Sequence, residues 1–135
     1  MPDTKFVLDA NTIMLHLNDA INLDSFLSAW PECGRCISVV GFIEVLSKPD
    51  ISPEDDQEAR DFLSDCEIMD ITPSIREKAI QIRRFKKTIK LPDAVIAATA
   101  LELGATLLSS DDHMKNLAWP GLTVLDVMDS QDETN

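Results

Sequence analysis

Four acidic side chains of this sequence stand where they could act together on one substrate. Asp9 and Asp111 each follow a short apolar run. Asp93 lies at the start of an alanine-rich segment, and Glu44 lies inside a predicted helix. Carboxylates that are packed together repel one another, and a cluster of them stays ionised when a cation lies between them. Oxygen ligands without a nearby Cys or His pair favour Mg²⁺ or Mn²⁺ over zinc. The pattern predicts such a site, to which Asp112 could add a fifth carboxylate.

The elements that carry these acids must bring them together. Apolar runs predict strands over residues 5–8, 36–40, 67–71, 106–109 and 122–127. Periodic apolar positions predict helices over residues 12–17, 23–30, 42–46, 59–66, 74–87 and 91–103. The alternation predicts an α/β protein, a three-layer α/β/α sandwich with a central parallel sheet of four to five strands. Ligands bind beyond the carboxyl ends of such strands, where the four acids would lie.

The length of 135 residues fits one domain, predicted over residues 1–128 and followed by a polar tail over residues 129–135. No apolar run reaches the ~18 residues of a membrane span, and no secretory signal is visible, so we expect a cytoplasmic protein without a membrane partner. Three cysteines in that setting predict reduced thiols. Cys33 and Cys36 form a C-x-x-C pair that supplies half of a zinc site at best.

Each acid also has a purely structural explanation. Asp9 and Asp111 could cap the helices that follow them. Asp93 could complement a helix dipole, and Glu44 could be a solvated helix position. The surroundings of the acids favour a functional role instead. Asp93, for example, interrupts an otherwise apolar segment, where a polar group usually has a partner or a task.

Four sequence blocks, in order along most of the chain, resemble those of PIN-domain nucleases. Residues 9–12 (DANT) resemble the D-x-N-[ST] opening, and Ser38 with Glu44 resembles the S-x5-E element. Residues 90–98 (KLPDAVIAA) are similar to the K-x-P-D-x-x-I-A-A block, and residues 109–114 (SSDDHM) are similar to the [TS]-x-D-x-x-F block. The subgroup that the chain resembles most is the VapC-type toxins of toxin–antitoxin pairs.

The resemblance implies a PIN-like fold and a Mg²⁺-dependent endoribonuclease, with Mn²⁺ as an alternative metal, that hydrolyses RNA phosphodiester bonds. The acids implied to hold the metal and to be catalytic are Asp9, Glu44, Asp93 and Asp111. Supporting polar groups are implied at Asn11, Thr12, Ser38 and Ser109. A cognate antitoxin and a homodimer are implied as well. The sequence departs from the pattern at Met114, where an aromatic residue is common, which affects packing more than chemistry.

The charge distribution bears on the expected partners. A net charge of −12 argues against a polyanionic partner for the molecule as a whole. Residues 76–90, however, hold seven basic residues against Glu77 alone, a net charge of +6, and lead directly into Asp93. The candidates for RNA contact are Arg83, Arg84, Lys86, Lys87 and Lys90. Residues 50–70 carry nine acids and Arg60, and could receive a basic antitoxin segment. Both segments could equally be solvated faces.

Two other functions remain open. A haloacid-dehalogenase-like phosphatase would use Asp9 as its nucleophile, but Asn11 stands where the second aspartate of that signature is needed. A PIN fold kept only for binding would be a non-catalytic interaction module. His16 and His113 lack the pairing of a metal-independent ribonuclease, and we predict both to be surface or loop residues.

Overall fold

Five short parallel strands form the centre of the computed structural model, which describes residues 5–129. The strands are β1 (Lys5–Leu8), β2 (Gly34–Ser38), β3 (Glu67–Met69), β4 (Thr106–Leu108) and β5 (Thr123–Leu125). They pair in the order β3-β2-β1-β4-β5, and every pair is parallel. The chain therefore builds the sheet outward from β1 on one side and then crosses to the other side of β1. In parallel sheets the crevice at such a switch point, here between β1 and β4, is the usual place for a ligand.

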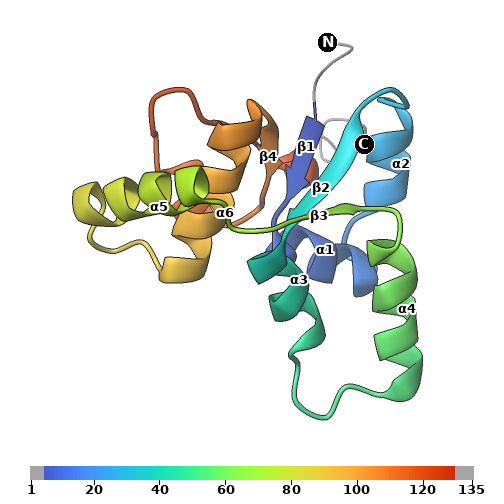
Figure 1. The fold of residues 1–135 in the computed structure, drawn as a ribbon. Coiled ribbons are helices and arrows are strands. Elements are labelled where there is room, and N and C mark those ends of the chain that lie inside the picture. The colour runs from blue at the N-terminus through green and yellow to red at the C-terminus, as the bar shows by residue number, and fades with distance from the viewer. Residues whose placement is uncertain (1–4, 130–135) are drawn as a thin grey trace.

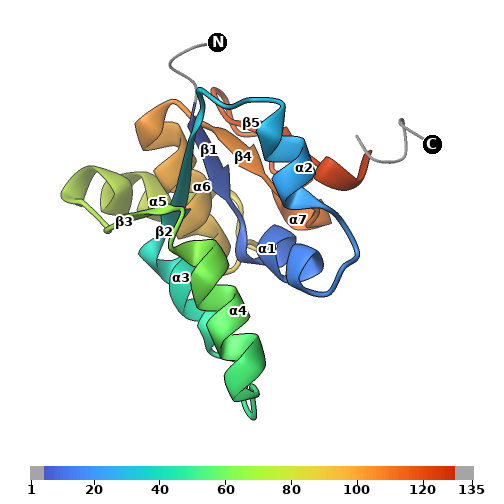
Figure 2. The same ribbon diagram turned by 90° about the vertical axis from the view of Figure 1, so that its right-hand side faces the viewer.

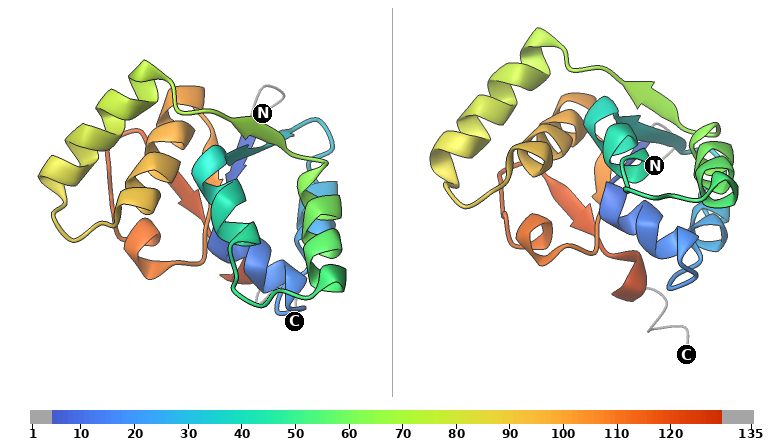
Figure 3. Two further views of the ribbon diagram at one scale, coloured as in Figure 1. Left: turned by 60° about the horizontal axis from the view of Figure 1, so that its bottom comes forward. Right: turned by 90° about the horizontal axis from the view of Figure 1, so that it is seen from below.

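Helices cover both faces of this sheet (Figures 1 and 2). They are α1 (Ala10–Leu17), α2 (Leu23–Ser28), α3 (Val39–Leu46), α4 (Pro53–Leu63), α5 (Pro73–Phe85), α6 (Leu91–Leu103) and α7 (Asp112–Lys115). One buried cluster joins α5 and α6 to one face of the sheet, and a second joins α1, α2 and α4 to the other. Figure 3 shows α5 and α6 on one side of the strands and α1 and α4 on the other. The predicted three-layer α/β/α sandwich with a parallel sheet is confirmed.

The helix predicted over residues 91–103 is confirmed at both ends. Pro92 lies in its first turn, and Gly104 ends it with a φ of 61°, a left-handed conformation that glycine adopts without strain. Residues 94–100 of this helix, α6, are all buried. Its alanines let the helix lie close to both the sheet and α5, which brings Asp93 to the carboxyl ends of the strands.

Side-chain caps move two helix starts away from their predicted positions. The helix predicted from residue 59 begins at Pro53, because the Ser52 side chain accepts the N–H of Asp55 and caps α4. The helix predicted from residue 42 begins at Val39, because the Ser38 hydroxyl accepts the N–H of Val40 and caps α3. The strand predicted over residues 36–40 accordingly ends at Ser38. In both cases a serine hydroxyl satisfies a free backbone N–H, a local signal that apolar periodicity does not contain.

Several smaller predictions can be compared with residues 5–129. Cys36 and Cys66 are free thiols. No helix in the described part of the chain is long and apolar enough to cross a membrane. The predicted polar tail lies, except for Asp129, outside the described residues. The expectation of a surface or loop position is wrong for His16, whose side chain is only 18% exposed in α1, where Nδ1 accepts the N–H of Leu23 at 3.0 Å.

Candidate active site

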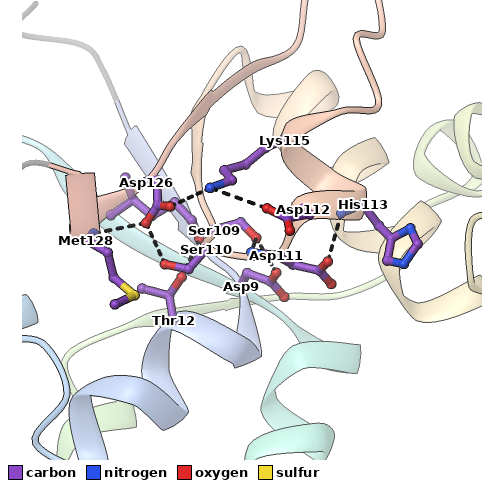
Figure 4. Close-up of polar contacts among 11 residues, drawn as sticks. Asp9, Thr12, Ser109, Ser110, Asp111, Asp112, His113, Lys115, Asp126 and Met128 are labelled. Carbon is purple, nitrogen blue, oxygen red and sulfur yellow. Dashed lines mark hydrogen bonds and ion pairs between the residues drawn. The ribbon is translucent and has the colours of Figure 1, made fainter.

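Asp9 and Ser109 meet at the switch point of the sheet. Asp9 follows β1 and Ser109 follows the neighbouring strand β4, and the N–H of Asp9 donates to the carbonyl of Leu108 at 3.0 Å. The Ser109 hydroxyl donates to Oδ2 of Asp9 at 2.7 Å and accepts the N–H of Asp111 at 3.1 Å (Figure 4). One buried hydroxyl thus links two residues of the predicted acidic set.

Asp9 is 3% exposed, and its ionisation is unfavourable. Burial raises its pKa from 3.8 to about 6, against the opposing effect of the Ser109 hydrogen bond, and the charges of Asp93, Asp111 and Glu44 raise it further. Although Asp9 stands at the N-cap position of α1, its side chain makes no capping hydrogen bond. The capping explanation for Asp9 is therefore wrong. The charge effects on Asp9 show that the other three predicted acids lie within electrostatic reach of it.

Glu44 and Asp93 also act on the pKa of Asp9, and the four residues Asp9, Glu44, Asp93 and Asp111 are from here called the acidic cluster. Burial raises the pKa of Glu44, and the charge of Asp93 adds to the effect. Burial and the charge of Asp111 raise the pKa of Asp93. Lys90 lowers both pKa values, which places its ammonium group near both carboxylates.

Asp111 has two roles in the structure. Its Oδ1 accepts the N–H of His113 at 2.9 Å and caps α7, as the structural explanation predicted. Its charge nevertheless raises the pKa of both Asp9 and Asp93. The imidazole of His113 lowers the pKa of Asp93, so this exposed histidine borders the acidic cluster.

Two of the predicted supporting groups, Thr12 and Ser38, bond to backbone around the acids. The buried Thr12 hydroxyl donates to the carbonyl of Leu108 at 3.2 Å, which fixes α1 to the end of β4. The buried Ser38 caps α3, the helix that carries Glu44. Asn11 is exposed at the start of α1. Asp112 has an 85% exposed side chain 3.6 Å from the Lys115 ammonium group, and it is not among the acids that raise the pKa of Asp9 or Asp93.

The predicted RNA-contacting residues divide into two groups. Lys90 lies beside the acidic cluster, and Lys86 lines a cavity of about 260 Å³ together with His113. Arg83, Arg84 and Lys87 instead line an apolar groove of about 790 Å³ between α3, α5 and α6. Arg83 also donates through Nη1 to the carbonyl of Ile89 at 2.7 Å, which ties α5 to the turn before α6.

A hydrogen-bond network at the end of β5 was not predicted from the sequence. Asp126 is 7% exposed and accepts the Ser110 hydroxyl at 2.6 Å, the Lys115 ammonium group at 2.7 Å and the N–H of Met128 at 2.9 Å (Figure 4). These bonds anchor the segment that carries Ser109 and Asp111. Asp126 directly follows β5, but the strand predicted over residues 122–127 contains it, so the strand-end signal that singled out Asp9 did not identify Asp126.

The donor set of the acidic cluster suits a hard cation. All four groups are carboxylates, and their mutual repulsion, which raises the pKa of Asp9, is what a bound cation would relieve. As the side chains stand, no three His, Cys, Asp or Glu residues among residues 5–129 are close enough together to hold one. The four carboxylates thus affect one another electrostatically, but their side chains as they stand do not enclose a cation.

Solved structures with a similar fold include toxin–antitoxin complexes. One from Klebsiella pneumoniae is 28% identical with a TM-score of 0.71, covering 88% of this chain and 96% of that chain. The structure of VapBC2 from Rickettsia felis bound to a DNA fragment from its promoter is 22% identical, with a TM-score of 0.77, and the match covers 91% of this chain and 98% of that chain. VapBC-1 from nontypeable Haemophilus influenzae is 15% identical with a TM-score of 0.78, covering 93% and 99%. At under 25% identity, the last two show a shared fold.

A family comparison extends this likeness from fold to sequence. The model of the PIN domain family matches residues 6–120, a range that contains the whole acidic cluster. A search of curated proteins finds no match. The sequence match over most of the chain, the parallel sheet and the four acids gathered at its switch point agree, and the chain belongs to the PIN domain family.

Proposed function

We propose that this PIN-domain protein is a Mg²⁺-dependent endoribonuclease that acts as the toxin of a toxin–antitoxin pair. The observation that carries the proposal is Asp9, a buried carboxylate whose pKa is raised by burial and by three acids from three other elements. Such clustering is unfavourable for an isolated fold and favourable around a divalent cation. Mn²⁺, which also prefers oxygen ligands, would be an alternative metal.

Asp9, Glu44, Asp93 and Asp111 would hold the metal. When bound, a divalent cation supplies Lewis-acid chemistry for the hydrolysis of a phosphodiester. The chain contributes the positions of the ligands. Ser109 holds one oxygen of Asp9 through its 2.7 Å hydrogen bond, and α7 fixes Asp111 through the N–H of His113. Lys90, beside two of the carboxylates, would attract the phosphate and offset part of the negative potential around it.

The proposed antitoxin would have a suitable surface beside the acidic cluster. A cavity of about 420 Å³ between α1, α3 and α4 has apolar side chains, among them Met14 and Ile51. Glu44, Asp55 and Glu58 line the same cavity. This acidic rim supports the expectation that a basic antitoxin segment binds along residues 50–70. Toxin–antitoxin complexes among the structures with a similar fold support the pairing itself.

The homodimer and the cytoplasmic location stay predictions. Exposed apolar side chains would suit a contact between two copies, and they include Leu91 at 59% and Ile80 at 37% exposure. Both line the groove between α3, α5 and α6. An RNA substrate and an antitoxin would place the protein in the cytoplasm.

Family membership disfavours the phosphatase alternative, and the chain offers Asn11, not a second aspartate, at the position that reaction requires. The non-catalytic alternative shares the fold with the proposed nuclease. Only a measurement of activity separates these two, because a binding module could keep the same acids.

The proposal is tested by incubation of defined RNAs with the purified protein, with Mg²⁺ and with EDTA. We expect cleavage with Mg²⁺ only. Asp9→Ala and Asp93→Ala should each lower the cleavage rate by more than the roughly 10- to 100-fold that loss of an outer-shell partner costs. Asp70→Ala, which removes an exposed acid that follows β3, is the matched control and should cleave like the wild type.

Metal-dependent cleavage that survives both Asp9→Ala and Asp93→Ala would show that the acidic cluster is not the active site. Equal cleavage in Mg²⁺ and in EDTA would overturn the metal requirement. If no RNA in the panel is cut under either condition, the non-catalytic alternative is favoured.

A further inference from the structure

A small cavity of about 260 Å³ lies between the turn that joins α5 to α6 and the helix α7. Its apolar part is formed by Ile89 and Leu117, which are 5% and 3% exposed. Its other lining residues are polar: Lys86, Thr88, Asp112, His113 and Asn116. The cavity therefore combines an apolar surface with donors and acceptors of hydrogen bonds, and neither the proposed metal nor the proposed antitoxin uses it.

Both walls of this cavity are held in place by the fold. In the turn, the N–H of Ile89 donates to the carbonyl of Lys86 at 3.1 Å, and Arg83 donates to the carbonyl of Ile89 at 2.7 Å. In α7, the N–H of Asn116 donates to the carbonyl of Asp112 at 2.8 Å. The Lys115 ammonium group fixes α7 to Asp126 at 2.7 Å. The cavity is thus a built feature of the chain.

The cavity adjoins the acidic cluster through His113. The N–H of this residue donates to Oδ1 of Asp111 at 2.9 Å, and Asp112 and His113, the two residues that follow Asp111, both line the cavity. A nucleic-acid strand with a phosphate at the acidic cluster would therefore pass directly beside the cavity.

The polar lining of the cavity suits a nucleobase better than a phosphate. A phosphate accepts hydrogen bonds only, so it could not use the acceptor oxygen of the Asn116 amide. A base has apolar faces that pack on aliphatic or imidazole groups, and an edge with both donors and acceptors. Lys86 can donate to such an edge, and the Asn116 amide can both donate to it and accept from it.

We propose that the cavity between the α5–α6 turn and α7 binds the base of a nucleotide next to the scissile phosphate and gives the nuclease a base preference at that position. The inference rests on the proposed nuclease function for its role, but the binding of a base can be measured without cleavage. Unpaired bases in single-stranded RNA are the usual targets of such recognition.

The first experiment uses the two histidines of the chain as reporters. Imidazole proton shifts are followed by NMR in EDTA while AMP, GMP, CMP or UMP is added, with ribose 5-phosphate as the base-free probe. At least one nucleotide should shift the His113 signal, and ribose 5-phosphate should not. His16 is the internal control, because it is mostly buried in α1 with its Nδ1 bonded to Leu23. Equal shifts of His113 with ribose 5-phosphate, or no shift with any nucleotide, would overturn the proposal.

The second experiment maps cleavage sites on an RNA with a randomised segment. Lys86→Ala and Asn116→Ala should weaken the base preference beside the cut at least about fivefold, the lower range for one well-placed base contact. Cleavage should stay Mg²⁺-dependent. Arg76→Ala is the matched control, because it removes the same charge as Lys86→Ala from the opposite end of α5 and should keep the preference.

A base preference unchanged in both Lys86→Ala and Asn116→Ala would overturn the role of the cavity. If the wild type cuts no RNA, the proposed nuclease function fails, and the histidine signals then decide by themselves whether the cavity binds a base. The two failures are therefore distinguishable.

Discussion

Asp9 is held by the fold in an environment that disfavours its charge. Burial, together with three neighbouring acids, raises its pKa from 3.8 to about 6, so the folded chain binds this proton more tightly than the unfolded chain. The free energy of unfolding therefore falls as the pH rises from 3.8 to about 6, and stays lower above that range. Residues at functional sites often carry such a cost, which a bound ligand then offsets.

Asp9→Asn is predicted to stabilise the chain at pH 8 in EDTA, because the amide keeps the shape of the side chain and can still accept the Ser109 hydroxyl. The expected gain is on the order of 3 kcal/mol, and it should nearly vanish at pH 4, where folded Asp9 is protonated. Urea unfolding at the two pH values measures the difference. Asp70→Asn, at an exposed position, should change little at either pH. An equal effect of Asp9→Asn at both pH values would contradict the assignment.

At the scale of elements, the site depends on β5 although β5 contributes none of the four acids. Burial alone would raise the pKa of Asp126, but hydrogen bonds from Lys115, Ser110 and the N–H of Met128 lower it below its ordinary value. The stability that Asp126 contributes is therefore present above the ordinary pKa of an aspartate and is lost as the pH falls through the lowered value. This network holds the segment between β4 and α7 in place.

Asp126→Asn is expected to lower the free energy of unfolding at pH 7 by about 1.5–3 kcal/mol, the range for hydrogen bonds to a charged group. It should also slow cleavage, because Ser109 and Asp111 lie on the anchored segment. Urea unfolding and the RNA assay measure the two effects. Asp129→Asn, which changes an exposed acid one turn further on, serves as the control. Wild-type stability and activity of Asp126→Asn would show that the network does not position the site.

At the scale of the whole molecule, the net charge of −12 is a poor guide to nucleic-acid binding because the charges are segregated. The five basic residues predicted to contact RNA lie in two regions. Lys86 and Lys90 lie on the side of the acidic cluster, whereas Arg84 and Lys87 line the apolar groove with α3. Only the first pair is placed to hold a strand whose phosphate lies at the metal.

We predict that the double variant Lys86→Ala/Lys90→Ala flattens the salt dependence of RNA binding. With about 0.7 counterions released per contact to a single strand, the slope of log K against log salt should change by about 1.4. Fluorescence anisotropy on the Asp9→Asn background measures binding without cleavage. Arg84→Ala/Lys87→Ala removes the same charge and should leave the slope unchanged. If this second variant flattens the slope as much as the first, the strand follows the groove instead.

The sequence by itself determined the fold class, the helix α6 and the family. Apolar runs and periodic apolar positions report which residues are buried, and burial is decided largely by local pattern. Pro92 and Gly104 fixed the ends of α6 because helix termini obey local rules. Asp9 and Asp93 could be named in advance because they stand at recognisable local signals, a strand end and a first helical turn.

The tertiary structure alone decided which of these groups meet. Asp126 serves the site only because β5 pairs with β4. Lys86 and Lys87 line different cavities only because of the path of the turn between α5 and α6. The raised pKa of Asp9 likewise needs burial and charges from distant segments. The physical reason is common to all three: strand order, the path of a turn and the local electric field depend on contacts between residues far apart in the sequence, which no local pattern encodes.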